Sequence, residues 1–153
     1  MKTVKYSIVL FLLLFFYSCS TMELTPADFS WPIESVLKVD NNGNIQDQRY
    51  SVTLNAKGLF FTETGDSLAY LDKKLHLIRN SSGYYFIVGN NFKNVYVFSG
   101  IDGAMRLKNK IVISDSTGIQ NPAFNQRPPY IELSYGDKKI NLSVDGIERE
   151  NGK

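Results

Sequence analysis

The chain of 153 residues has little cysteine, little histidine and no marked excess of charge: it contains one Cys, one His, 17 Lys+Arg and 15 Asp+Glu. One cysteine cannot build a disulfide framework or a zinc site made of thiolates. One histidine excludes metal sites that need several imidazoles. Hydrophobic residues make up 43% of the chain and aromatic residues 13%, which excludes a disordered chain, and the length suits one domain.

The chain also lacks an apolar run long enough to cross a membrane. Residues 8–16 (IVLFLLLFF) form an unbroken nine-residue run after Lys2 and Lys5, whereas a spanning helix needs about 20 apolar residues. A basic start followed by a short apolar run is typical of a signal peptide. Cleavage would remove Lys2 and Lys5 and leave 15 basic and 15 acidic side chains, so we expect no binding to nucleic acid.

The only cysteine, Cys19, ends the sequence Phe16-Tyr17-Ser18-Cys19 directly after this run. The segment resembles the lipobox of bacterial lipoproteins. The resemblance implies that Cys19 carries diacylglycerol and that residues 1–18 are cleaved as a lipoprotein signal peptide. It also implies that acyl chains hold the protein to the cell envelope. Because Ser20 rather than Asp follows the cysteine, the outer membrane is the expected location.

We divide the rest of the chain into a tether (19–32), one all-β domain (33–148) and a C-terminal tail (149–153). Thr25 and Pro26 predict one capped helical turn in the tether. After the tether, no window of about 11 residues has a convincing helical period. Short β-rich segments recur instead, and they predict a single antiparallel sandwich or small barrel of about 8–10 short strands. The expected strands are 33–39, 50–54, 59–62, 69–71, 75–79, 84–88, 95–98, 110–114, 131–135 and 140–144.

Two hairpins stand out in this pattern. Residues 41–44 (NNGN) contain an Asn-Gly pair that favours a tight turn, and we expect 33–39 to pair with 50–54 across it. In the last hairpin, Leu133 and Leu142 fall on the face that alternation predicts to be buried. Glu132 and Asn141 fall on the face predicted to be exposed.

No set of residues predicts catalysis. Gly65-Asp66-Ser67-Leu68 resembles the signature of the GDSL esterases, but the Asp-x-x-His of that family is missing, since Lys73 precedes His76 by three residues. Asp40 begins a segment similar to a calcium loop, but Ile45 stands where an EF-hand requires glycine. We therefore expect no enzymatic activity, no metal site and no cofactor.

The segment 118–129 (GIQNPAFNQRPP) is the longest stretch without strand character, and long loops in compact domains are often functional. Its prolines make it stiff, and Phe124, Asn125 and Arg127 offer one apolar anchor, an amide and a guanidinium. Phe92, in a polar turn, is a further candidate. These four residues suit an envelope protein or a glycan. The alternative is a crossover that packs Phe124 onto the sheet.

The sequence thus predicts a membrane-anchored lipoprotein of the cell envelope that acts as a binding or structural module. One alternative is a small-ligand carrier, in which a closed barrel encloses an apolar cavity. The other is a hydrolase that acts on envelope polymers, which is disfavoured because no nucleophile and base can be paired.

Overall fold

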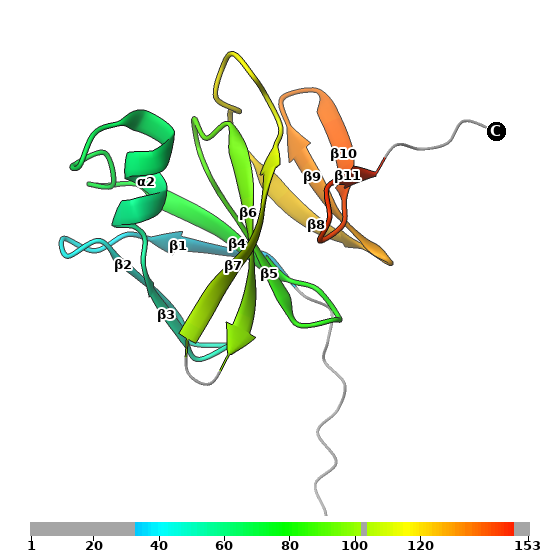
Figure 1. Cartoon of the computed structure of the whole chain (residues 1–153), viewed down its shortest axis with the longest axis horizontal. Coiled ribbons are helices and arrows are strands. Elements are labelled where there is room, and N and C mark those ends of the chain that lie inside the picture. Colours follow the sequence, from blue (N-terminus) through cyan, green and yellow to red (C-terminus); the bar gives the residue numbers. More distant parts are fainter. Residues whose placement is uncertain (1–32, 102–103, 149–153) are drawn as a thin grey trace, which may run out of the picture.

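The computed structural model describes residues 33–101 and 104–148, which form antiparallel strands and one short helix (Figure 1). The predicted signal peptide (1–18), the tether (19–32) with Cys19 and its expected helical turn, and the tail (149–153) lie outside the described residues. The expected antiparallel all-β class is confirmed. The sheets do not close on themselves, so the fold is a sandwich rather than a barrel.

A five-stranded sheet forms the middle layer. Its strand order is β1-β4-β5-β6-β7, and every neighbouring pair is antiparallel. The strands are β1 (Ser35–Lys38), β4 (Lys74–Arg79), β5 (Tyr84–Gly89), β6 (Asn94–Ile101) and β7 (Ala104–Val112). The central strand β5 is buried from Tyr85 to Gly89, so layers must cover both faces of the sheet.

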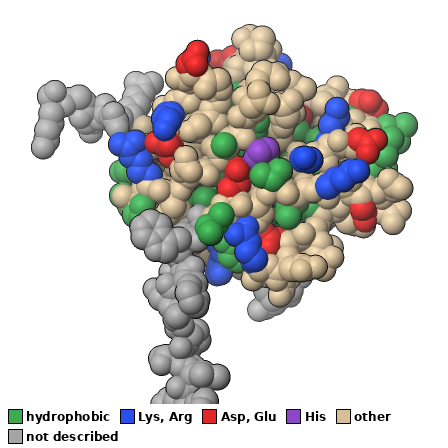
Figure 2. Space-filling model, turned by 180° about the vertical axis from the view of Figure 1, so that it is seen from behind, with side chains coloured by type: hydrophobic (Ala, Val, Ile, Leu, Met, Phe, Trp, Pro, Cys, Tyr) green, Lys and Arg blue, Asp and Glu red, His purple; other side chains and the backbone are tan. Residues whose placement is uncertain are grey.

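Charged side chains are mixed over the surface. Figure 2 shows Lys and Arg interspersed with Asp and Glu on the back of the molecule, with the single histidine near the middle of that face.

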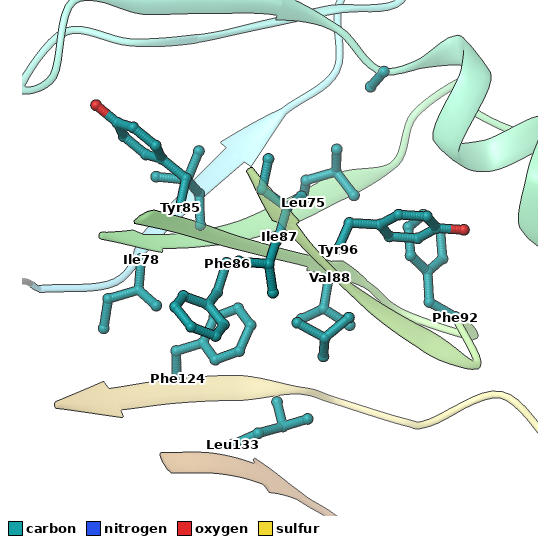
Figure 3. Close-up of a cluster of buried hydrophobic side chains, with 14 of the residues drawn as sticks. Leu75, Ile78, Tyr85, Phe86, Ile87, Val88, Phe92, Tyr96, Phe124 and Leu133 are labelled. Atoms are coloured by element: carbon teal, nitrogen blue, oxygen red, sulfur yellow. The ribbon is translucent and has the colours of Figure 1, made fainter. Parts of the chain in front are cut away.

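A four-stranded sheet, of order β11-β10-β9-β8, covers one face of the middle sheet. Its strands are β8 (Ala123–Arg127), β9 (Tyr130–Tyr135), β10 (Lys138–Leu142) and β11 (Ile147–Glu148). Between the two sheets, Ile78, Phe86 and Val88 point toward Phe124 and Leu133 (Figure 3). These side chains are at most 3% exposed, so this interface is the apolar core of the sandwich.

The hairpin of β2 (Asn44–Asp47) and β3 (Val52–Asn55), followed by α2 (Lys57–Thr64), lies against the other face. Leu75, Ile87 and Tyr96 point to this side of the middle sheet in Figure 3. Phe60 of α2 is 3% exposed and meets the ring of Phe92 edge-on, with 5.0 Å between centroids. The hairpin and the helix therefore form a third, smaller layer.

The expected partner of the first strand was wrong. The turn at 41–44 forms, and the Asp40 carboxylate stabilises it by accepting the N–H groups of Asn42 and Asn44 at 2.8 and 2.7 Å. It leads into β2, however, which pairs with β3, while β1 pairs with β4. Sequence reasoning missed β2 because the segment NIQD contains a single apolar residue.

Two other expected strands were also wrong. The segment 59–62 is the middle of α2, which ends where Gly65 takes a φ of 76° and donates its N–H to Phe61 O at 2.8 Å. An eight-residue helix is too short for periodicity to reveal, and burial of Phe60 decides its conformation. Residues 69–71 form turns in which Tyr70 is buried and Leu71 is exposed.

The last hairpin is confirmed, with Leu133 opposite Ile140 and Leu142 opposite Ile131. Glu132, however, was expected to be exposed and is only 7% exposed. Arg127 and Lys139, from the strands on either side, approach its carboxylate at 3.1 and 3.3 Å and cover it.

Candidate functional site

The two faces of the middle sheet are covered to different extents. The four-stranded sheet covers one face, whereas β3 and α2 leave part of the other face open beside β6 and β7. The result is an open groove of about 770 Å³, which we call the β3–β7 groove. It is lined by Thr53, Leu54, Asn55, Gly58, Leu59, Thr62, Tyr96, Phe98, Met105, Leu107 and Lys110.

A β-bulge in β7 determines which side chains line this groove. Val97 of β6 lies opposite Asn109, whereas the next residue, Phe98, lies opposite Leu107. Lys108 is therefore an extra residue on β7. Such a bulge reverses the alternation of side chains along the rest of the strand.

The bulge places Met105 and Leu107 on the same face as Lys110, which lies opposite Tyr96. A regular strand would turn Met105 and Leu107 to the opposite face. Leu107 is 51% exposed, so the bulge presents an apolar side chain to solvent within the groove. Groups of apolar side chains exposed in a concave surface with a polar rim are typical of binding sites.

Tyr96, which lines the groove, is part of a polar contact with α2. Glu63 of α2 accepts three hydrogen bonds of 2.7 Å, from Lys93 N, Asn94 Nδ2 and Tyr96 Oη. Burial, together with the hydrogen bond and charge of Glu63, raises the pKa of the Tyr96 phenol well above its usual range. The phenol therefore stays a neutral donor that fixes α2 against β6, and Lys110 is the charged residue in the groove lining.

A neighbouring hollow of about 290 Å³ shares Thr53 and Met105 with the groove. The rings of Tyr50 and Tyr85 lie here edge-to-face, 5.8 Å apart. The Arg79 guanidinium lies 5.9 Å and 5.5 Å from their respective centroids. Apolar and aromatic surface therefore follows β3 along its whole length.

The binding residues expected from the sequence lie elsewhere. Half of the supposed loop 118–129 is strand β8, and Phe124 is 3% exposed against the middle sheet. Phe92 is 1% exposed and packs on Phe60 and Tyr96. The expectation that these two rings form exposed anchors was wrong, because both fill the core.

The polar members of that set do reach the surface. Asn125 and Arg127 alternate with Phe124 along β8 and are exposed, and Arg127 contacts Glu132 at 3.1 Å. They lie in the four-stranded sheet, which does not line the β3–β7 groove. A role for them in binding stays a prediction.

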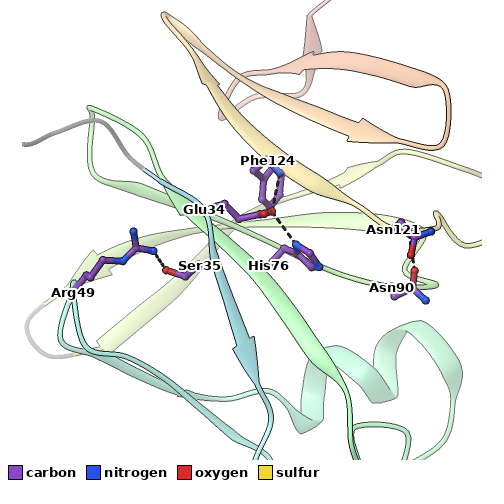
Figure 4. A network of polar contacts seen from close by, with 7 residues as sticks. All are labelled: Glu34, Ser35, Arg49, His76, Asn90, Asn121 and Phe124. Atoms are coloured by element: carbon purple, nitrogen blue, oxygen red, sulfur yellow. Dashed lines mark hydrogen bonds and ion pairs between the residues drawn. The ribbon is translucent and has the colours of Figure 1, made fainter.

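His76 has a partner that spacing could not reveal. Its Nδ1 lies 2.8 Å from Glu34 Oε1, and the same carboxylate oxygen accepts the backbone N–H of Phe124 at 2.7 Å (Figure 4). The contact thereby joins the start of β1 and β4 to β8 in the other sheet. Three elements distant in sequence are fixed together at one carboxylate.

In the described part of the chain, this His–Glu pair has no hydroxyl or thiol side chain beside it. His76 borders a hollow of about 390 Å³ whose lining residues carry no hydroxyl or thiol group; they are Phe60, Asp72, Lys73, Lys74, His76, Asn90, Asn121 and Pro122. A histidine and a carboxylate activate a nucleophile only when one lies within hydrogen-bond reach. The geometry is that of a structural link between sheets.

The groove residues left a weak signal in the sequence. Within residues 104–110 (AMRLKNK), apolar and polar side chains alternate from Met105 to Lys108, which is typical of an edge strand. Residues 104–109 were not expected to form a strand, because they contain no β-branched residue. The strand expected in this region began only at residue 110. A register shift and a gap between layers depend on tertiary packing and leave no local pattern.

Among residues 33–101 and 104–148, no group of three or more His, Cys, Asp or Glu side chains is arranged to hold a metal ion. The single helix found in those ranges is too short and polar to cross a membrane. No protein-family model, curated protein or solved structure shows a significant match to the chain.

Proposed function

We propose that the protein is a lipid-anchored module of the cell envelope, held to the outer membrane through Cys19, that binds a ligand or partner in the β3–β7 groove. The observation that carries the binding role is the groove itself, in which a β-bulge turns Met105 and Leu107 outward. The anchoring role rests on the resemblance of the Phe16–Cys19 segment to a lipobox.

A core position gains stability when an apolar side chain is buried, but a half-exposed leucine in a groove contributes little to folding. A ligand that covered Leu107 would remove this surface from water and gain that free energy instead. The volume of about 770 Å³ falls in the range of roughly 300–1,000 Å³ that is usual for ligand sites.

The second candidate, a carrier of a small apolar ligand, is favoured by the same volume. It is weakened by the shape of the site, because a carrier encloses its ligand, whereas this groove is open along one side and half exposes Leu107. We therefore favour a module that docks a partner at its surface.

Anchoring is tested by Cys19→Ala in the full chain. We expect the variant to lose metabolic labelling with palmitate and to leave the membrane fraction, because the described residues offer no spanning helix. Unchanged labelling and membrane partition would contradict the anchor and leave the groove unaffected.

The groove is tested with 8-anilinonaphthalene-1-sulfonate, whose apolar rings and sulfonate match the apolar floor and Lys110. The mature chain with Cys19→Ser serves here, because acyl chains would themselves bind the dye. We expect saturable dye fluorescence that Leu107→Asp removes. Leu68→Asp is the matched control, since Leu68 is 58% exposed and lies outside the groove. Equal loss in both variants, or in neither, would contradict a binding groove.

A further inference from the structure

Both strands that flank the groove have an unpaired edge. In the described part of the chain, β7 is the last strand of the five-stranded sheet and β3 is the last strand of its two-stranded sheet. Their backbone N–H and C=O groups on the groove side have no partner strand. Edges of this kind are templates for pairing with another chain.

The two strands also run in the same direction. The antiparallel neighbours from β7 through β6, β5 and β4 to β1 give β1 and β7 the same direction. The tight turn at 41–44 then reverses the chain into β2, and a hydrogen bond from Ser35 to Asp47 joins the start of β1 to the end of β2. Because β3 is antiparallel to β2, it points the same way as β7 (Figure 1).

β3 and β7 belong to different sheets, and no strand of the described residues pairs with the free edge of either. A strand inserted between β3 and β7 in the opposite direction would be antiparallel to both, which is the arrangement of every strand pair in the described residues. Antiparallel pairing also forms the more favourable backbone hydrogen bonds. Residues of both strands line the groove, so a segment bound there would lie beside both.

The side chains of β7 indicate the character of such a strand. β7 carries Arg106, Lys108 and Lys110 and no acidic residue, although the mature chain is neutral overall. Within the described ranges, none of these three side chains forms an ion pair. In the four-stranded sheet, by contrast, two basic side chains contact the single carboxylate of Glu132. Opposite charges facing each other on neighbouring strands stabilise the pair.

The lining of the groove indicates which side chains of the added strand should be apolar. Alternate side chains of an added strand would point onto Leu54, Leu59, Phe98, Met105 and Leu107 and would need to be apolar. The remaining side chains would lie on the opposite face, where Arg106 points, whereas Lys110 lies on the groove face and would meet an acidic side chain at one end of the segment. The ligand that fits is an extended segment with apolar residues at every second position and acidic residues between them.

We propose that the β3–β7 groove binds an extended acidic peptide segment of a partner protein, which adds as an antiparallel strand along the free edge of β7. This inference rests on the proposed function, since it names the ligand class of the same groove. Backbone hydrogen bonds to β7 supply affinity, and the apolar floor and basic residues supply selectivity.

The test uses the mature lipid-anchored protein on phosphatidylcholine vesicles, which carry no net charge. The probe is a fluorescent peptide of about ten residues, the length of a long strand, with alternating glutamate and valine. We expect saturable binding by fluorescence anisotropy, weakening with added salt, and slower amide hydrogen exchange across β7 in the complex. A peptide in which lysine replaces glutamate should not bind.

Variants and a blocked peptide separate the two contributions. Arg106→Glu with Lys110→Glu should weaken binding by about tenfold or more, as expected for reversed charge across an interface. Lys138→Glu, a charge reversal in β10, is the matched control and should change little. N-methylation of every second backbone amide of the peptide should abolish binding, because it removes the hydrogen bonds but keeps the side chains.

The outcomes distinguish this proposal from the one on which it rests. Equal binding of the N-methylated peptide would overturn strand addition, and equal binding of the lysine peptide would overturn the acidic preference. If the dye binds in a manner that Leu107→Asp removes and the acidic peptide does not bind, the peptide is wrong while a binding groove stands. If no peptide binds and Leu107→Asp leaves the dye signal unchanged, both proposals fail, and the basic residues of β7 serve only to keep the edge unpaired.

Discussion

The two faces of the middle sheet belong to the same strands, but one face is fully covered and the other is partly open. Toward the four-stranded sheet, Phe86 and Val88 meet Phe124 and Leu133, and none of these side chains is more than 3% exposed. Toward β3 and α2, Leu107 is 51% exposed above an open groove. One face is therefore a sealed core and the other is partly a surface.

The difference comes from the length of what covers each face. Four strands span the sealed face, whereas two strands of four residues and an eight-residue helix leave part of β6 and β7 uncovered on the other. The bulge at Lys108 then adds apolar side chains to the uncovered part instead of withdrawing them. The sealed face thus stabilises the fold, and the open face carries the groove in which we propose that a partner binds.

The largest effect should follow from truncation on the sealed face. Phe124→Ala removes a 3% exposed ring between the sheets, and we expect it to lower the free energy of unfolding by about 3–5 kcal/mol. Domains have only about 5–15 kcal/mol in total, so this loss is severe. Urea unfolding of the wild type and the variant measures it.

Asn125→Ala is the control for Phe124→Ala, because Asn125 is the next residue of β8 and points outward. We expect a cost of about 1 kcal/mol or less, because this substitution removes only a hydrogen bond of 3.4 Å to Glu132. If the two substitutions cost the same, Phe124 does not seal the interface, and the contrast between the two faces of the sheet is lost.

A smaller, pH-dependent effect should appear at Glu132, on the far side of the sealed face. Burial alone would raise the pKa of this carboxyl, but hydrogen bonds from Arg127, Lys139 and Asn125 outweigh it and hold the pKa below its ordinary value. The ionised carboxylate therefore stabilises the folded state above the ordinary pKa. That contribution disappears as the pH falls through the lowered pKa of the folded state.

Glu132→Gln should accordingly lower the free energy of unfolding by about 1–2 kcal/mol near pH 7. The loss should be smaller than for a fully buried ion pair, because the side chains of Arg127 and Lys139 are largely exposed. The difference from the wild type should shrink on acidification below about pH 4. Urea unfolding across this range measures it, with Asp137→Asn in the exposed hairpin turn as the control. A difference that is constant with pH would show that the carboxylate charge contributes nothing.

Parts of the fold with local patterns were predictable. Alternation in residues 131–142 placed Leu133 and Leu142 correctly, because a strand with one buried face repeats every two residues. Alternation wrongly predicted that Glu132 is exposed, because a carboxylate in a central strand can be covered by long basic side chains from both neighbouring strands. The alternation of one strand carries no information about what its neighbours place over it.

The candidate site could not be predicted, and the reason is geometric. Phe124 and Phe92 look exposed in the sequence because polar residues and prolines surround them, yet each is inserted into the core from a turn or an edge. Met105 and Leu107 read as one face of an ordinary strand, and only the register shift opposite Phe98 turns them into the groove. Pairing between distant segments decides both outcomes.

The smallest effect on stability should come from the open face, and it provides the sharpest test of the comparison. Leu107 and Leu133 are the same residue type in two neighbouring layers, 51% and 0% exposed. Leu107→Asp should change the free energy of unfolding by about 0.5 kcal/mol or less, because the carboxylate stays in water and lies near the basic residues of β7. Leu133→Asp buries an unpaired charge and should prevent folding. Urea unfolding and circular dichroism measure both. If Leu107→Asp also unfolds the protein, the groove is part of the core, its apolar side chains are explained by folding, and both faces of the sheet serve stability.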